Sequence, residues 1–280
     1  MTVPLVGCDF SSRPRPQKPI VLAWGQAERG VLRLERWEAL YSLEAYADWL
    51  RAPGSWVGGF DLPFGLPRPL VEALAWPTEW RACIDHYAAL SRAEIRAVFA
   101  AYCDARPAGS KLAHRETDRP AGASPSMKWV NPPVAYMLHA GVPPLMAAGV
   151  TLPGLYVPPA DAHSGAKIGL EAYPGFLARQ VLGARSYKSD DKAKHTTDRW
   201  VARKDLLHAL EWGQLLDCRL QLKSSQREAL IDDASGDKLD AVLCLMQAAW
   251  AAQRGQNGDP LFGLPAHLDP LEGWIVGVPG

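Results

Sequence analysis

The stretch SGDKLDAVLCLMQAAW, residues 235–250, decides how the rest of the chain is interpreted. Its apolar residues, among them Leu243, Leu245 and Met246, fall on almost every side of a helix, which is typical of a buried helix. The stretch nevertheless begins with Asp237 and Asp240, which lie one turn apart on one face. Because buried carboxylates are costly unless they are paired or bind a metal, both aspartates are candidate metal ligands.

Acidic residues also lie at or near the ends of the predicted strands. Asp9 follows an apolar run, Asp61 ends a buried segment just before a proline, and Glu171 lies in the alternating segment KIGLEAYP. Neighbouring strands, with the helix packed across them, would gather five carboxylates: Asp9, Asp61, Glu171, Asp237 and Asp240. Hard divalent ions such as Mg²⁺ or Mn²⁺ take oxygen ligands and stabilise the charges that form when a phosphodiester is cleaved. The pattern therefore favours metal-dependent phosphoryl transfer.

The order of the predicted elements indicates an α/β fold. Three alternating segments near the N-terminus suit an antiparallel meander, and a helix and a further strand follow them. Capped helical patterns then replace the alternating ones until residue 167. We therefore expect a single domain with a mixed β-sheet and flanking helices. Residues 1–66 and 167–280 form its core, and residues 67–166 form a mostly helical insertion.

Two further segments have patterns of their own. Residues 106–128, RPAGSKLAHRETDRPAGASPSMK, are rich in Pro, Gly, Ser and charge and predict a mobile loop. Residues 272–278, EGWIVGV, predict an added edge strand.

Composition excludes several classes of protein and partner. The 30 basic and 30 acidic residues balance, so any site for a polyanion has to be local. The 5 cysteines lack the spacing of a zinc site, and the seven histidines form no metal-binding motif. The N-terminus does not have the form of a signal peptide, and prolines interrupt the longest apolar stretch. These features predict a cytoplasmic protein without a membrane partner.

Six segments, in order, resemble the DUF429 family of predicted RNase H-like nucleases. They are GCDFSSRPRPQKPI, GFDLPFGLP, LEAYPGFLAR, RSYKSDD, SGDKLDAVLCLMQAAW and EGWIVGVP. The D-x-x-D-A pattern at Asp237 and Asp240 is also similar to the catalytic helix of RuvC-type Holliday-junction resolvases. The resemblance implies an RNase H-like fold with Asp9 on the first strand, Asp61 on the fourth and Asp240 on the C-terminal helix as metal-site residues. Asp237 and Glu171 are then the accessory carboxylates.

The substrate side of the site is less defined. Arg13, after the first strand, and Lys188, in the motif YKSD that matches the family, are the candidate phosphate-binding residues. The expected substrate is nucleic acid, either DNA or RNA, and the sequence does not predict an oligomeric state. Two alternatives remain open. An actin-like nucleotide-binding phosphotransferase would use a related fold, although the chain has no Gly-rich phosphate loop. In a catalytically silent binding module, the carboxylates would be structural and neutralised by lysine or arginine.

Overall fold

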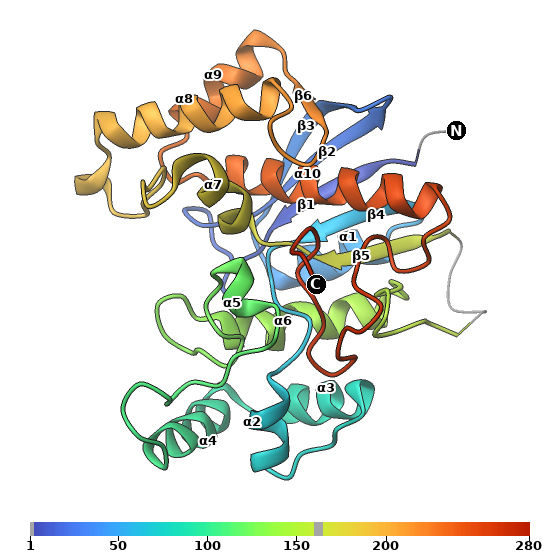
Figure 1. The fold of residues 1–280 in the computed structure, drawn as a ribbon, viewed down its shortest axis with the longest axis vertical. Helices are drawn as coiled ribbons and strands as arrows, with labels where there is room; N and C mark the ends of the chain where they lie inside the picture. Colours follow the sequence, from blue (N-terminus) through green and yellow to red (C-terminus); the bar gives the residue numbers. More distant parts are fainter. Residues whose placement is uncertain (1–2, 160–164) are drawn as a thin grey trace.

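The computed structural model describes residues 3–159 and 165–280 and has an α/β architecture around one mixed β-sheet (Figure 1). The six strands have the order β5-β4-β1-β2-β3-β6. They are β1 (Leu5–Asp9), β2 (Ile20–Glu28), β3 (Val31–Leu40), β4 (Trp56–Phe60), β5 (Lys167–Glu171) and β6 (Arg219–Gln221). The mixed α/β class predicted from the sequence is confirmed. All six strands also lie outside residues 67–166, where a helical insertion was expected.

The pairing of the strands brings the C-terminal ends of β1, β4 and β5 to the same end of the sheet. β1, β2 and β3 form the expected antiparallel meander, whereas β4 is parallel to β1 and β5 is parallel to β4. The register pairs Cys8 with Phe60, and Phe60 with Glu171. Parallel neighbouring strands end on the same side of a sheet. Asp9 is the last residue of β1, Asp61 directly follows β4 and Glu171 is the last residue of β5, so the three carboxylates lie on that side.

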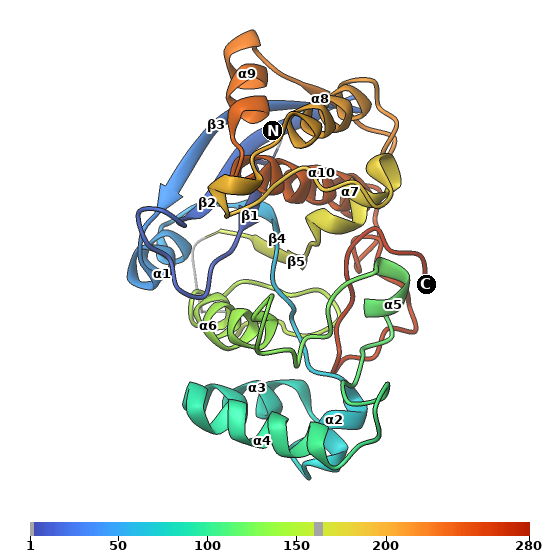
Figure 2. The ribbon, with the colours of Figure 1, turned by 90° about the vertical axis from the view of Figure 1, so that its left-hand side faces the viewer.

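The described ranges contain ten α-helices. They are α1 (Leu43–Arg51), α2 (Arg68–Ala73), α3 (Trp80–Ala89), α4 (Arg92–Asp104), α5 (Asp118–Ala121), α6 (Val134–Ala147), α7 (Pro174–Leu182), α8 (Thr197–Glu211), α9 (Ser224–Asp232) and α10 (Asp237–Gln256). A short 3₁₀ helix, η1 (Lys192–Lys194), precedes α8. One apolar core joins α7, α8, α9 and α10 to the sheet, and a second joins α1 and α6 to its other face. The helices α2, α3 and α4 lie beyond α6, away from the sheet (Figure 2).

Two glycines allow α10 to lie directly on the sheet backbone. A Cβ atom added to Gly7 in β1 would lie 2.0 Å from the Ala241 carbonyl oxygen. A Cβ atom added to Gly59 in β4 would lie 2.5 Å from the Cys244 carbonyl oxygen. Only glycine permits so close an approach of two backbones. The first turn of α10 is thereby held next to the ends of β1 and β4.

The C-terminal segment was expected to be an edge strand, and that prediction is wrong. Residues 272–278 form turns instead, and their backbone pairs with β5 only where the Val276 N–H donates to the Glu171 carbonyl at 2.9 Å. Gly273 and Gly277 have φ values of 71° and 86°, which belong to turns rather than to extended strands. The segment is therefore apolar because it is buried, with Trp274, Ile275 and Val276 in the core.

The segment 106–128 also differs from the mobile loop that its composition predicted. Only residues 107–111 are continuously exposed, whereas Arg115, Thr117 and Asp118 are buried and α5 begins at Asp118. The reason is an ion pair between Arg115 and Glu171 of β5, which anchors the charged part of the segment to the sheet.

Candidate metal centre

Three carboxylates converge where β1, β4 and α10 meet. One oxygen from each of Asp9, Asp61 and Asp240 lies within 4.8 Å of the other two. Asp9 is the last residue of β1, Asp61 directly follows β4, and Asp240 is in the first turn of α10. Asp9 and Asp240 are buried, at 7% and 0% exposure, and Asp61 is half-buried. We call these three residues the carboxylate cluster.

Burial and mutual repulsion make negative charge costly in this cluster. Burial, reinforced by the charges of Asp240 and Asp237, raises the pKa of Asp9 well above its ordinary value. Burial also raises the pKa of Asp240, and it raises that of Asp61 to about 7 with the help of Asp240 and Glu171. Without a cation, burial and repulsion therefore favour carboxyls that keep their protons. A divalent cation would compensate the charge and release them.

Two neighbouring residues of the segment between α7 and α8 contact Asp240. The Tyr187 hydroxyl and the Lys188 ammonium each donate a hydrogen bond to its carboxylate. The Lys188 charge also lowers the pKa values of Asp9 and Asp61, against the effect of burial. Arg203 of α8 fixes this segment by donating to the Tyr187 carbonyl at 2.7 Å. Lys188, predicted as a phosphate-binding residue, thus lies at the carboxylate cluster. Tyr187 was not among the predicted site residues, although it is the first residue of the motif YKSD.

Asp9 and Asp61, the other two residues of the cluster, have the charges of Lys188 and Lys18 near them. No N–H or O–H group of residues 3–159 and 165–280 donates a hydrogen bond to the carboxylate of Asp9 or Asp61. Their oxygens are therefore available to a ligand, whereas those of Asp240 already have protein partners.

Asp237 lies outside the carboxylate cluster although it is one turn from Asp240. Its carboxylate pairs with Lys18, at 2.6 Å, in the connection between β1 and β2, and Lys18 also contacts Asp190 at 3.0 Å. Although burial favours the neutral amine, the charges of Asp9 and Asp237 raise the pKa of Lys18. Asp237 therefore holds a lysine beside the site, and the structure does not place it with the three converging ligands.

Glu171 is likewise near the carboxylate cluster but occupied by a cation. Arg115 of the insertion donates to both of its carboxylate oxygens, at 2.6 and 2.7 Å, and to Asp118. The Phe64 N–H donates to Glu171 as well, at 2.9 Å. Although burial favours the neutral guanidine, the attraction of Glu171 and Asp118 raises the pKa of Arg115. The structure thus brings together three of the five predicted carboxylates and gives the other two lysine or arginine partners.

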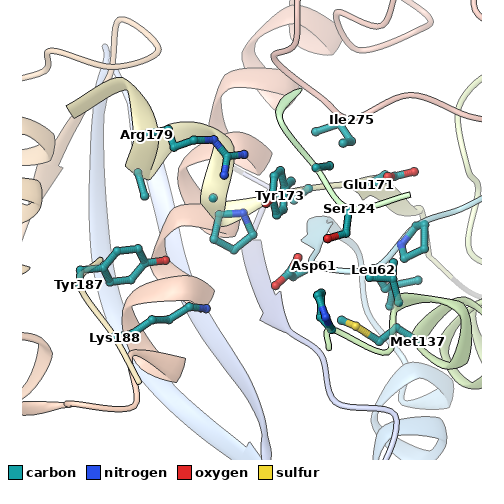
Figure 3. A pocket seen from close by; sticks show the side chains of 18 of the residues that line it. Asp61, Leu62, Ser124, Met137, Glu171, Tyr173, Arg179, Tyr187, Lys188 and Ile275 are labelled. Carbon is teal, nitrogen blue, oxygen red and sulfur yellow. The ribbon is translucent and has the colours of Figure 1, made fainter. Parts of the chain in front are cut away.

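A pocket of about 550 Å³ opens beside the carboxylate cluster, and Asp61 and Lys188 are in its wall (Figure 3). Segments of the insertion, including Ser124 and Met137, line the pocket together with residues of β5, α7 and the segment after α7. Arg13, the second predicted phosphate-binding residue, is exposed in the connection between β1 and β2 and is not in this wall.

Comparisons with known proteins do not assign the chain to a family. No family model, no curated protein and no solved structure matches it. The case for a function therefore rests on the geometry and chemistry of the site. Among the helices of the described residues, none combines the length and the apolar character needed to cross a membrane.

The raised pKa of Asp61 predicts how pH affects the metal-free protein. A carboxyl with a folded-state pKa of about 7, above its ordinary value of 3.8, keeps a proton that the unfolded chain loses. Its contribution to stability is complete below the ordinary value and is lost as pH rises through about 7. In EDTA, urea unfolding of the wild type should therefore show stability that falls between about pH 4 and pH 7, the interval between the two pKa values, and that changes little above it. Asp61→Asn should flatten this dependence, and equal slopes for the two proteins would contradict the assignment.

Proposed function

We propose that this protein is a divalent-metal-dependent nuclease with an RNase H-like fold. The observation that carries the proposal is the convergence of Asp9, Asp61 and Asp240 within 4.8 Å. They come from the first strand, the end of the fourth strand and the C-terminal helix, the same elements that the resemblance to the DUF429 family implies. The strand order, with a meander followed by two parallel strands, supports the same fold.

The donor set of the carboxylate cluster fits a hard divalent cation. Its ligand atoms are all carboxylate oxygens, the type that Mg²⁺ and Mn²⁺ prefer. Lys188 pairs with one of the three carboxylates, and nearby Lys18 pairs with Asp237 and Asp190, so negative charge remains uncompensated in the cluster when all three are ionised. A bound Mg²⁺ or Mn²⁺ would supply charge stabilisation for the attacking and leaving oxygens of a phosphodiester.

The remaining residues of the site have roles that follow from their contacts. Tyr187 orients Asp240 through its hydroxyl, and Arg203 in turn fixes the backbone of Tyr187. Lys188 is in the wall of the pocket and can donate to a phosphate that lies beside Asp61. Lys18 holds Asp237, so the first turn of α10 is tied to the connection between β1 and β2.

One observation favours a catalytically silent binding module instead. Lys188 pairs with Asp240, and pairing with a lysine is the arrangement that such a module predicts. The two functions differ in metal binding. A nuclease site should bind Mn²⁺ in place of the lysine contact, whereas a structural ion pair should exclude it.

The test combines metal binding with cleavage. Purified protein is titrated with Mn²⁺ and Mg²⁺ while its melting temperature is followed. It is then incubated with single-stranded DNA, duplex DNA, RNA, an RNA–DNA hybrid and a branched junction. A metal-induced rise in melting temperature together with cleavage supports the proposal. If neither is seen with either metal, the binding module becomes the favoured function.

Replacing Lys188 with Met should strengthen metal binding. The ammonium competes with a cation for Asp240, so its removal should lower the Kd for Mn²⁺ by about tenfold or more. Cleavage should fall in the same variant because a phosphate contact is lost. Isothermal titration with Mn²⁺ measures the first effect. Lys192→Met, an exposed position on η1, is the matched control and should leave both properties unchanged. An unchanged or weaker Kd in Lys188→Met would contradict the prediction.

A further inference from the structure

The pocket of about 550 Å³ borders the carboxylate cluster at Asp61. Among the three ligands, only Asp61 is in the pocket wall, and Lys188 is beside it. Asp9 and Asp240 are buried and do not line the pocket. Figure 3 shows Asp61 facing the space between Tyr187 and Lys188 on one side and Leu62 and Met137 on the other. A substrate in this space would meet the cluster at Asp61.

Much of the pocket wall is apolar. Leu62, Met137, Pro174 and Ile275 contribute apolar surface to it. Tyr173 adds an aromatic ring, and the Arg179 guanidinium lies 5.2 Å from its centroid. Arg179 is itself fixed by a 2.6 Å hydrogen bond to the Ala121 carbonyl. The pocket thus combines an apolar region with the cations of Lys188 and Arg179.

We propose that this pocket holds one unpaired nucleotide of a single-stranded nucleic acid. The proposal rests on the proposed nuclease function and specifies its substrate. The apolar wall suits the flat face of a base, as in proteins that bind single strands without sequence preference. Lys188 and Arg179 place positive charge where the phosphate and sugar of that nucleotide lie.

The size of the pocket favours a single strand over a duplex. Its volume falls within the range of small-molecule sites, roughly 300–1,000 Å³. A duplex, whose major groove alone is about 12 Å wide, does not fit into a pocket of this size. A paired base therefore has to leave the stack before it can enter the pocket. An unpaired strand enters without that cost.

The experiment fills the pocket from two separate segments of the chain. Ser124 belongs to the insertion and Ala184 to the segment after α7, and both line the pocket. Ser124→Trp and Ala184→Trp each place a large ring there, and Ser225→Trp places the same ring on the exposed surface of α9. Fluorescence anisotropy in Mn²⁺ measures the Kd of each variant for a labelled oligothymidine with phosphorothioate linkages. The same oligonucleotide annealed to its complement is the duplex probe.

The wild type should bind the single strand at least about tenfold more tightly than the duplex, which is the size expected for stacking one base. Each pocket-filling variant should lose at least about tenfold in single-strand binding, and Ser225→Trp should lose none. The Mn²⁺-induced rise in melting temperature should persist in all four proteins, which shows that each is folded with its metal site intact. Equal or tighter duplex binding by a wild type that binds Mn²⁺ would overturn this inference alone. Unchanged binding by both pocket variants would overturn it as well. A wild type that does not bind Mn²⁺ would instead contradict the proposed function.

Discussion

Asp61→Asn is expected to abolish metal-dependent cleavage while leaving the metal-free protein folded. Asp61 contributes an oxygen to the carboxylate cluster, and no described N–H or O–H group donates to its carboxylate. The substitution therefore removes a ligand charge without breaking a hydrogen bond or ion pair in the protein. Loss of charge stabilisation at the reacting phosphate should lower kcat by at least about 100-fold. Single-turnover cleavage in Mn²⁺ measures this effect, and circular dichroism in EDTA checks the fold.

The control for this prediction is Asp232→Asn. Asp232 is exposed at the end of α9, so its replacement should change neither cleavage nor the Mn²⁺-induced rise in melting temperature. If Asp61→Asn cleaved as fast as the wild type, Asp61 would not be a metal ligand. If it lost cleavage but kept the full rise in melting temperature, the residue would act after metal binding.

Asp240→Asn is a less direct test of the same ligand set. Asp240 accepts hydrogen bonds from Tyr187 and Lys188, so its replacement also removes an ion pair and changes the position of the segment that holds both donors. A loss of stability in that variant would thus be expected for a nuclease and for a silent module alike.

The three residues of the carboxylate cluster could be found from sequence because each is marked by a local pattern. Asp9 ends an apolar strand, Asp61 follows a strand that a proline terminates, and Asp240 begins a helix that is otherwise apolar. The sequence signals that mark the start of a helix also come from residues close together in the chain. Ser91 and Glu94 form the expected capping box, with hydrogen bonds of 2.7 and 3.3 Å. Such signals involve residues within one turn or one strand of each other.

No local sequence pattern marks the ion pairs around the carboxylate cluster. Arg115 and Glu171 are 56 positions apart, and Lys18 and Asp237 are 219 apart. A charged residue in a Pro- and Gly-rich segment has the pattern of an exposed loop, and only the folded chain shows that its partner is buried. Strand β6 was not predicted from the sequence, for a related reason. Its three residues are too few for an alternating pattern and are fixed by pairing with β3.

Arg115→Met is expected to destabilise the protein by about 3–5 kcal/mol, the usual cost of removing one partner of a buried ion pair. Arg115 is 2% exposed, and its loss leaves the buried carboxylates of Glu171 and Asp118 without their cation. Met keeps much of the apolar volume, so the effect should come mainly from charge. Urea unfolding at neutral pH, followed by tryptophan fluorescence, measures the free energy of unfolding.

The matched control is Arg119→Met, because Arg119 is four positions away but exposed on α5. It should change the free energy of unfolding by no more than about 0.5 kcal/mol, as is usual for surface positions. In the Arg115→Met background, adding Glu171→Gln should restore part of the lost stability, because the amide removes one of the two unpaired buried charges. If Arg115→Met and Arg119→Met were equally stable, the ion pair would not anchor the insertion. Segment 113–127 would then have to be held by its apolar contacts, such as those of Met127 and Ala121 with the two cores.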